Sequence, residues 1–176
     1  MTGQAASHKA FPMKAYLDIE TDREGTISVI GILIGSQGFK QFVGKGITSH
    51  KVENCLRQAR TIVTFNGDSF DLPQIKKQLN LDLKTTHHSY DLFKVKKQLN
   101  IKGGLKELEK LYGIERKTEG VNGFKAVQLW EIYRRHGRKD ALELLLQYNK
   151  EDVLNLIPLE EKFNELMKEQ LYEQEL

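Results

Sequence analysis

Four acidic side chains stand in three short segments of the sequence, at spacings that suit divalent metal chemistry. Asp18 and Glu20 are two residues apart in KAYLDIE, residues 14–20, so on a β-strand their carboxylates project to the same side. Asp71 ends the segment TFNGDSFD, and Asp152 lies in LLQYNKEDVLNL. Carboxylates that lie close together repel one another unless they share a cation. Oxygen ligands of high negative charge favour Mg2+ or Mn2+ over zinc.

Each segment also has an ordinary structural explanation. A D-x-E sequence also occurs where a strand simply ends in solvent. An aspartate at the start of a helix, such as Asp71, can cap backbone N–H groups, and Asn66 suits a turn. Tyr148 stands four residues before Asp152 and shares a helix face with it if the helix is continuous. Asn149 can instead cap a new helix, which would bend the chain between the two side chains.

The elements that must position these residues follow from the hydrophobic patterns. Strand patterns cover residues 14–20, 26–34, 38–43 and 61–65, and the first three predict an antiparallel group. Residues 89–92 fit either a short last strand or a helix start. Helical patterns cover residues 49–59, 71–79, 105–112, 126–136, 141–148 and 153–171. The sequence therefore predicts an α/β fold with early strands and a helical C-terminal half.

Length and composition indicate one globular domain. The chain has 176 residues and is 39% hydrophobic and 29% charged, which excludes collagen-like and disordered classes. No segment approaches the roughly 18 apolar residues of a membrane span. Residues 1–13 lack the apolar region of a secretory signal, and we predict a flexible tail there, followed by one domain over residues 14–176. Cys55 is the only cysteine, so there is no disulfide partner within the chain, and a reducing, cytoplasmic location is expected.

Basic residues dominate the body of the chain. Residues 1–158 contain 25 basic and 18 acidic residues, whereas residues 159–176 contain 2 lysines and 6 glutamates. A basic surface can bind a polyanion, although a solvated helix face also explains each basic cluster. Phe70 or Tyr90 can stack on a terminal base, or either can belong to the core. The candidate phosphate contacts are Lys94, Lys96, Lys97, Lys125, Arg134 and Arg135.

The three acidic segments gain significance from their order in one chain: D-x-E on a first strand, N-x3-F-D after a later strand, and Y-x3-D on a late helix. In this combination the sequence resembles the DEDD superfamily of 3'-5' exonucleases, in its tyrosine-bearing (DEDDy) subclass. Within that subclass it is most similar to the compact YprB-like ribonuclease H-like family. The resemblance runs from about residue 14 to residue 159 and includes FNGDSFDLP, GLKELEKLYGI and YNKEDVLNL. It implies a ribonuclease H-like fold, with a mixed central β-sheet flanked by helices.

The resemblance also implies the site residues. Asp18 and Glu20 match the first exonuclease motif, Asp71 the second, and Asp152 with Tyr148 the third. These four acids would hold two Mg2+ or Mn2+ ions, with Asp18 bridging them. Tyr148 would orient the water that attacks the phosphate.

The implied activity is metal-dependent hydrolysis of phosphodiester bonds from the 3' end of DNA or RNA, with a single-stranded end preferred. The partner is therefore nucleic acid. Asn66 and Phe70 match the accessory positions of the second motif, where substrate binds. Gln147 stands where the histidine-bearing subclass has its general base, five residues before Asp152, which favours the tyrosine subclass.

Three alternatives remain open from the sequence. A catalytically silent nucleic-acid-binding or scaffold module would keep the fold, but this chain retains all four acids and the tyrosine. A metal-dependent endonuclease on the same fold differs in needing no chain end. A protein-interaction domain would use the acidic C-terminal helix, which either binds a partner or packs on this domain. That helix has an acidic face and an apolar face on opposite sides: Glu160, Glu161, Glu165 and Glu169 on the first, and Leu159, Phe163, Leu166 and Met167 on the second.

Overall fold

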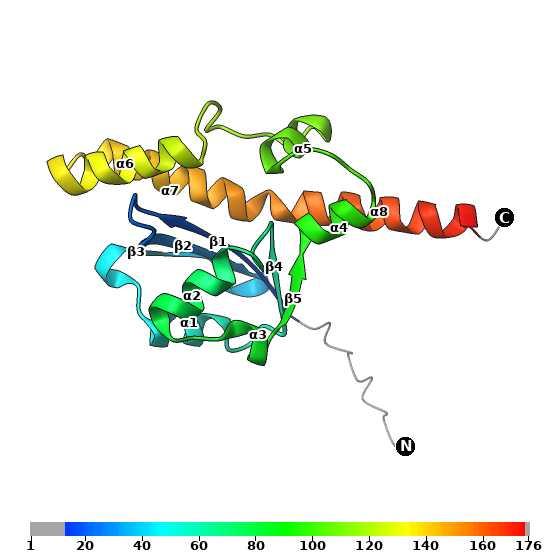
Figure 1. Cartoon of the computed structure of the whole chain (residues 1–176), viewed down its shortest axis with the longest axis horizontal. Coiled ribbons are helices and arrows are strands. Elements are labelled where there is room, and N and C mark those ends of the chain that lie inside the picture. The colour runs from blue at the N-terminus through cyan, green and yellow to red at the C-terminus, as the bar shows by residue number, and fades with distance from the viewer. Residues whose placement is uncertain (1–12, 175–176) are drawn as a thin grey trace, which may run out of the picture.

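A five-stranded mixed sheet forms the centre of the molecule (Figure 1), in a computed structural model that describes residues 13–174. The strand order is β3-β2-β1-β4-β5. The first three strands pair antiparallel, whereas β4 and β5 run parallel to β1, which confirms the predicted α/β class and its antiparallel start. Of the predicted N-terminal tail, residues 1–12 lie outside the described residues. The strands are β1 (Lys14–Thr21), β2 (Ile27–Ile34), β3 (Gly38–Val43), β4 (Thr61–Thr64) and β5 (His88–Asp91).

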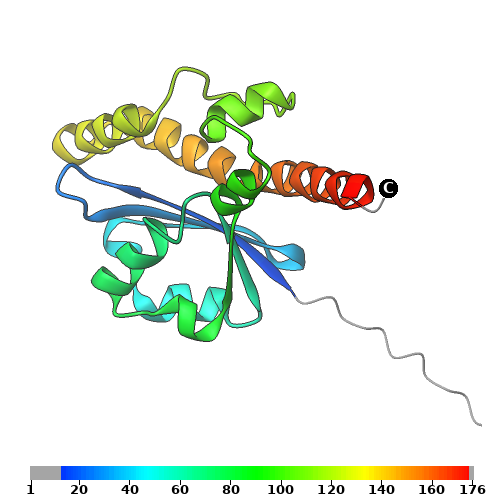
Figure 2. The same ribbon diagram turned by 45° about the vertical axis from the view of Figure 1, so that its right-hand side comes forward.

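Helices cover both faces of the sheet (Figures 1 and 2). One face carries α1 (Ser49–Leu56), α2 (Asp71–Leu79) and α3 (Leu83–Thr86). The other face carries α4 (Leu92–Gln98), α5 (Leu105–Leu111), α6 (Gly123–His136), α7 (Lys139–Leu154) and α8 (Leu156–Gln174). Short 3-10 turns, η1 (Gly35–Gln37) and η2 (Gly44–Gly46), flank β3.

The apolar core therefore has two layers, one on each side of the sheet. β2 is apolar almost throughout because both of its faces are covered: Ile30 and Ile32 pack toward α1 and α2, while Val29 packs against α6 and α7. The two faces of β1 differ. Leu17 and Ile19 pack on the side of α1 and α2, whereas Asp18 and Glu20 face the opposite side of the sheet. Alternation along this one strand thus places two carboxylates under α7.

Helix α7 corrects the predicted helix boundaries. The patterns predicted separate helices over residues 141–148 and 153–171, but α7 runs without interruption from Lys139 to Leu154, and the chain turns at Asn155. Asn149 does not cap a new helix; it is fully buried within α7. The sequence predicts either a short last strand or a helix start at residues 89–92, and both are present, because β5 ends at Asp91 and α4 starts at Leu92.

Helix α8 packs on this domain through its apolar side. Leu159 and Phe163 are fully buried in a cluster that also contains residues of β4, α4 and α5. The predicted polar face is wrong at one position: Glu160 is buried and accepts hydrogen bonds from Lys14 Nζ at 2.6 Å and Tyr16 Oη at 2.7 Å. This carboxylate fastens α8 to β1. Within the described part of the chain, no helix has both the length and the apolar character that crossing a membrane requires.

Candidate active site

Three of the four predicted acids meet where α7 crosses β1. One carboxylate oxygen from each of Asp18, Glu20 and Asp152 lies within 4.8 Å of the other two. The first two come from alternate positions of β1, and the third comes from the helix above it. Because α7 is continuous, Tyr148 lies one turn before Asp152, on the same face. The structure thus brings together residues that are more than 120 positions apart in the sequence.

The fourth acid, Asp71, reaches the group from the other side of the sheet. It is the first residue of α2 and is buried. Its carboxylate Oδ1 accepts a hydrogen bond of 3.0 Å from the backbone N–H of Ile19, between Asp18 and Glu20. This contact fastens the start of α2 to the strand that carries the first two acids. Asp71 lies outside the group of three but adds negative charge beside it.

Burial raises the pKa of every acid in this group. Loss of hydration is the main cause for each, because removing a carboxylate from water disfavours its charged form. Neighbouring carboxylates add to the effect at Asp18 and Glu20. Burial raises the pKa of Asp71 to about 7, although the Ile19 N–H opposes the shift. A divalent cation would replace the protons that these groups otherwise retain, so the all-oxygen set fits Mg2+ or Mn2+.

Asn149 positions Asp18 from the middle of α7. Its side-chain amide donates to Asp18 Oδ2 at 2.9 Å and to the Asp18 carbonyl at 3.2 Å, while its own Oδ1 accepts from Gln41 Nε2 at 2.8 Å. Room for this amide exists because Gly31 stands opposite Asp18 in the β1–β2 pair. A Cβ atom at position 31 would lie 2.3 Å from Asn149 Oδ1. The sequence pattern suggests only a capping role for Asn149.

Gly31→Ala is therefore expected to damage both the fold and the site. The added methyl group displaces Asn149, which costs about 1–3 kcal/mol of unfolding free energy, as overpacking of a core does. Asp18 also loses its donor, so Mn2+ should bind more weakly. Urea unfolding and Mn2+ titration measure the two effects. Gly46→Ala is the matched control, because nothing lies within 4 Å of a Cβ at that position. Equal, small losses in both variants would contradict the packing argument.

Two cations that the sequence analysis did not single out also contact the group. Lys106 of α5 places Nζ 2.6 Å from Tyr148 Oη and 3.5 Å from both carboxylate oxygens of Asp152. Arg116, in the segment after α5, donates to Asp152 Oδ1. Lys106 lies in GLKELEKLYGI, which carried the family resemblance without suggesting a role for this lysine. Nothing in the sequence pattern marks Arg116.

Tyr148 is a neutral phenol in this environment. It is buried, and both burial and the negative charges of Asp152, Glu20 and Asp18 raise its pKa. An ammonium group can only donate, so the phenol oxygen accepts from Lys106, and the phenol hydrogen remains available for another acceptor. Tyr148 can therefore act as a hydrogen-bond donor beside the acids at neutral pH.

The loop that leads to Asp71 is held by an aspartate that the sequence analysis did not single out. Asp91, at the end of β5, accepts hydrogen bonds from the backbone N–H groups of Asn66 at 2.7 Å, Asp68 at 3.1 Å and Phe93 at 3.0 Å. Asn66 has a positive φ of 66°, a conformation that asparagine tolerates. Phe70 follows with 41% of its surface exposed, directly before α2. The two accessory residues thus lie on a loop that is fixed to the sheet, and Phe70 is accessible to a ligand.

The six predicted phosphate contacts do not converge on the acids. Lys94 forms an ion pair with Asp68, and Lys96 is buried, with its ammonium donating to the carbonyl of Gly103. Among the described residues, no hydrogen bond or ion pair joins any of the six to the four acids. Their part in substrate binding stays a prediction. Three lie on α4, and three lie on α6, near its two ends: Lys94, Lys96 and Lys97, then Lys125, Arg134 and Arg135.

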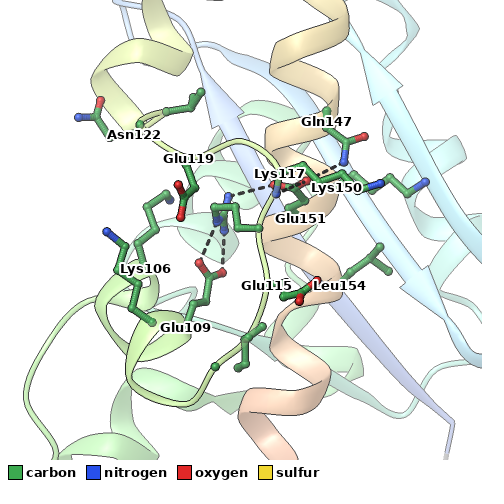
Figure 3. A pocket seen from close by; sticks show the side chains of 16 residues that line it. Lys106, Glu109, Glu115, Lys117, Glu119, Asn122, Gln147, Lys150, Glu151 and Leu154 are labelled. Carbon is green, nitrogen blue, oxygen red and sulfur yellow. Dashed lines mark hydrogen bonds and ion pairs between the residues drawn. The ribbon is translucent and has the colours of Figure 1, made fainter.

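A cavity of about 1040 Å³ opens beside the centre, between α5, residues 113–122 and α7 (Figure 3). Lys106 and Arg116 line it and also contact Asp152, so they stand between the cavity and the acids. Gln147 also lines this cavity and donates to Glu151 Oε1 at 2.7 Å. The Gln147 side chain is therefore hydrogen-bonded to Glu151, one turn further along α7.

The mixed sheet, the crossing helix and the acidic group together define an α/β protein of the ribonuclease H type. The chain belongs to the RNase_H superfamily, whose family model matches residues 15–164. This membership indicates a hydrolase that acts on nucleic acids.

Among solved structures, the chain is similar to the family B DNA polymerase from the hyperthermophilic archaeon Pyrobaculum calidifontis. The TM-score is 0.68 at 16% sequence identity, and the match covers 86% of this chain. It covers 24% of the polymerase, so the chain spans about a quarter of that protein's length. At this level of identity the likeness shows the fold. No curated protein matches the sequence.

Proposed function

We propose that this protein is a metal-dependent 3'-5' exonuclease of the tyrosine-bearing DEDD subclass, closest to the YprB-like family. It hydrolyses phosphodiester bonds of DNA or RNA, with a single-stranded end preferred. The observation that carries the proposal is the convergence of Asp18, Glu20 and Asp152 within 4.8 Å, with Tyr148 on the same helix face as Asp152. The superfamily membership supports a nucleic-acid substrate, and the structural likeness to a DNA polymerase agrees with it.

The acids would hold two Mg2+ or Mn2+ ions. Two such ions, about 3.5–4 Å apart, supply an activated water and stabilise the entering and leaving oxygens of a phosphoryl displacement. Asp18 is central to the group and would contact both ions. Glu20 and Asp152 would complete one site, and Asp71 would support the other, through water. Three of these side chains are already held in place: Asp18 by Asn149, Asp71 by the backbone of β1, and Asp152 by Lys106 and Arg116.

Tyr148 would orient the attacking water through a hydrogen bond. Its raised pKa keeps the phenol protonated, and Lys106 holds the phenol oxygen at 2.6 Å. Phosphoryl transfer depends mainly on placement and charge stabilisation, so a fixed hydrogen-bond donor is sufficient for this role.

Tyr148→Phe is expected to lower the rate constant for hydrolysis about 100-fold, because one positioned hydrogen bond is lost. The Mn2+ dissociation constant should change less than about twofold, since no carboxylate ligand is removed. Single-turnover cleavage and calorimetric Mn2+ titration separate these quantities. Tyr133→Phe on α6 is the matched control and should leave both unchanged. An unchanged rate in Tyr148→Phe would remove this residue from the mechanism.

Linear and circular single strands test the requirement for a chain end. We expect a 5'-labelled linear strand to yield a ladder that shortens from its 3' end, while a circle of the same sequence stays intact. Cleavage of the circle would replace the proposal with an endonuclease. Binding of both forms without cleavage under Mg2+ or Mn2+ would replace it with a nucleic-acid-binding module. Parallel DNA and RNA substrates identify the sugar that is accepted.

A further inference from the structure

Arg116 is a buried arginine that forms ion pairs with three acids, Glu109, Asp152 and, at 3.8 Å, Glu151. Its side chain is 7% exposed. Nε and Nη2 donate to the two carboxylate oxygens of Glu109 at 2.8 and 2.7 Å, and Nη2 also donates to Asp152 Oδ1. The paired bonds to Glu109 are visible as dashed lines at that residue in Figure 3. A single guanidinium thus connects a carboxylate of α5 to a predicted metal ligand of α7.

The partners of Arg116 are themselves fixed. Glu109 is 2% exposed and also accepts from Asn155 Nδ2 at 3.0 Å. Thr118 Oγ1 accepts from Arg116 Nη1 at 3.2 Å. Thr118 is in turn bound to Glu151 through its backbone N–H at 3.0 Å and its hydroxyl at 2.6 Å. A buried charge is tolerated only where such partners satisfy it, so the guanidinium has one well-defined position.

This position leaves the two oxygens of Asp152 in different states. Lys106 Nζ is equally far from both oxygens, at 3.5 Å, but only Oδ1 also accepts from Arg116. We propose that Arg116, clamped by Glu109, is a positioning residue that presents Asp152 to the metal through Oδ2 alone. The inference rests on the proposed metal-dependent nuclease and deepens it. Groups that orient a metal ligand in this way typically change metal affinity 10- to 100-fold when they are altered.

Charge alone is a competing explanation, since any cation would offset the clustered carboxylates. Arg116→Lys separates the two explanations because it preserves the charge but removes the planar fork that binds Glu109 and Asp152 together. Glu109→Gln tests the clamp from the other side, because it weakens the paired bonds without touching Asp152.

Calorimetric titration of the metal-free protein with Mn2+ measures the effect directly, without any activity assay. We expect Arg116→Lys and Glu109→Gln each to weaken Mn2+ binding about 10- to 100-fold. The variant with both substitutions should bind Mn2+ no more weakly than whichever single variant has the lower Mn2+ affinity, because Glu109 acts through Arg116. Arg138→Lys is the matched control, since Arg138 pairs with Asp140 on the exposed surface. Near-ultraviolet circular dichroism verifies that each variant is folded. If one single variant does not fold, Mn2+ binding by the other still tests the positioning role.

The outcomes distinguish this inference from the proposed function. Mn2+ binding by Arg116→Lys within twofold of the parent protein would overturn the positioning role and leave the nuclease proposal standing. Fully additive losses in the double variant would overturn the clamp by Glu109. If the parent protein itself does not bind Mn2+, both the nuclease proposal and this inference are wrong.

Discussion

Replacing Asp18 with asparagine is expected to abolish metal-dependent hydrolysis, with a loss of at least about 1,000-fold. Asp18 is the central ligand of the proposed centre, and the charges of Glu20, Asp152 and Asp71 all act on it. Asparagine has the same shape and retains an oxygen that can accept from Asn149, so the fold is kept. Turnover of a labelled oligonucleotide at saturating Mn2+ measures the loss. Full turnover in this variant would remove Asp18 from the mechanism.

The same substitution is expected to raise the melting temperature of the metal-free protein. Burial and three neighbouring carboxylates make the ionised Asp18 unfavourable, and asparagine removes that charge. In a chain of this size, each 1 kcal/mol of relief raises the melting temperature by about 2–4 °C. Asp140→Asn is the matched control, because Asp140 is exposed and pairs with Arg138. A lower melting temperature for Asp18→Asn, measured in EDTA, would contradict the electrostatic account.

The stability of the metal-free protein is expected to fall as the pH rises from about 4 to about 7. Asp71 has its pKa raised from 3.8 to about 7 in the folded chain, and burial also raises the pKa values of Asp18, Glu20 and Asp152. Between the unfolded and folded pKa values, the folded protein binds more protons than the unfolded chain. The free energy of unfolding therefore decreases with pH across this window. For Asp71 alone, three pKa units correspond to a loss on the order of 4 kcal/mol.

Urea unfolding in EDTA at pH 5 and pH 8 measures this dependence. Asp71→Asn should reduce the decline because it removes one of the four titrating groups. Mg2+ should restore stability at pH 8 more than at pH 5, since the ion replaces protons that are absent at the higher pH. Asp68 has the opposite pH dependence. Burial raises its pKa, but Lys94 and Lys84 outweigh burial and lower it to about 2. The stability that Asp68 contributes is therefore lost only below about pH 4. A free energy of unfolding that increases from pH 5 to pH 8 in EDTA would contradict the account.

Local patterns in the sequence were sufficient to predict most of the elements. Alternation in KAYLDIE correctly placed Asp18 and Glu20 on one side of β1, and the pattern over residues 26–34 correctly predicted the strand β2. The α/β class and the mixed sheet are confirmed. These features depend on neighbours within a few residues, which is the range over which hydrophobic period and turn chemistry act.

Contacts between distant segments account for what the sequence did not reveal. Asn149 looks like a cap because asparagine favours helix ends, but the carboxylate of Asp18 and the space above Gly31 stabilise it inside α7. Glu160 looks solvated on a helical wheel, but Tyr16 and Lys14 of β1 satisfy it when buried. Such positions carry no local signal.

The cations of the site show the same limit. Lys106 and Arg116 lie 46 and 36 positions from Asp152 in the sequence, and each contacts it only because α5 and the following segment fold over α7. Neither spacing nor periodicity relates these residues to the acids. The roles of all site residues remain predictions that the experiments above address.

Digestion of a 5'-labelled single strand by the purified protein tests the central claim most directly. The substrate is incubated with Mn2+, with Mg2+ or with EDTA, beside Asp152→Asn as the inactive control. The account predicts a ladder that loses one nucleotide at a time from the 3' end, present with either metal and absent with EDTA or in the variant. No cleavage with either metal, or cleavage that persists in EDTA or in Asp152→Asn, would contradict it.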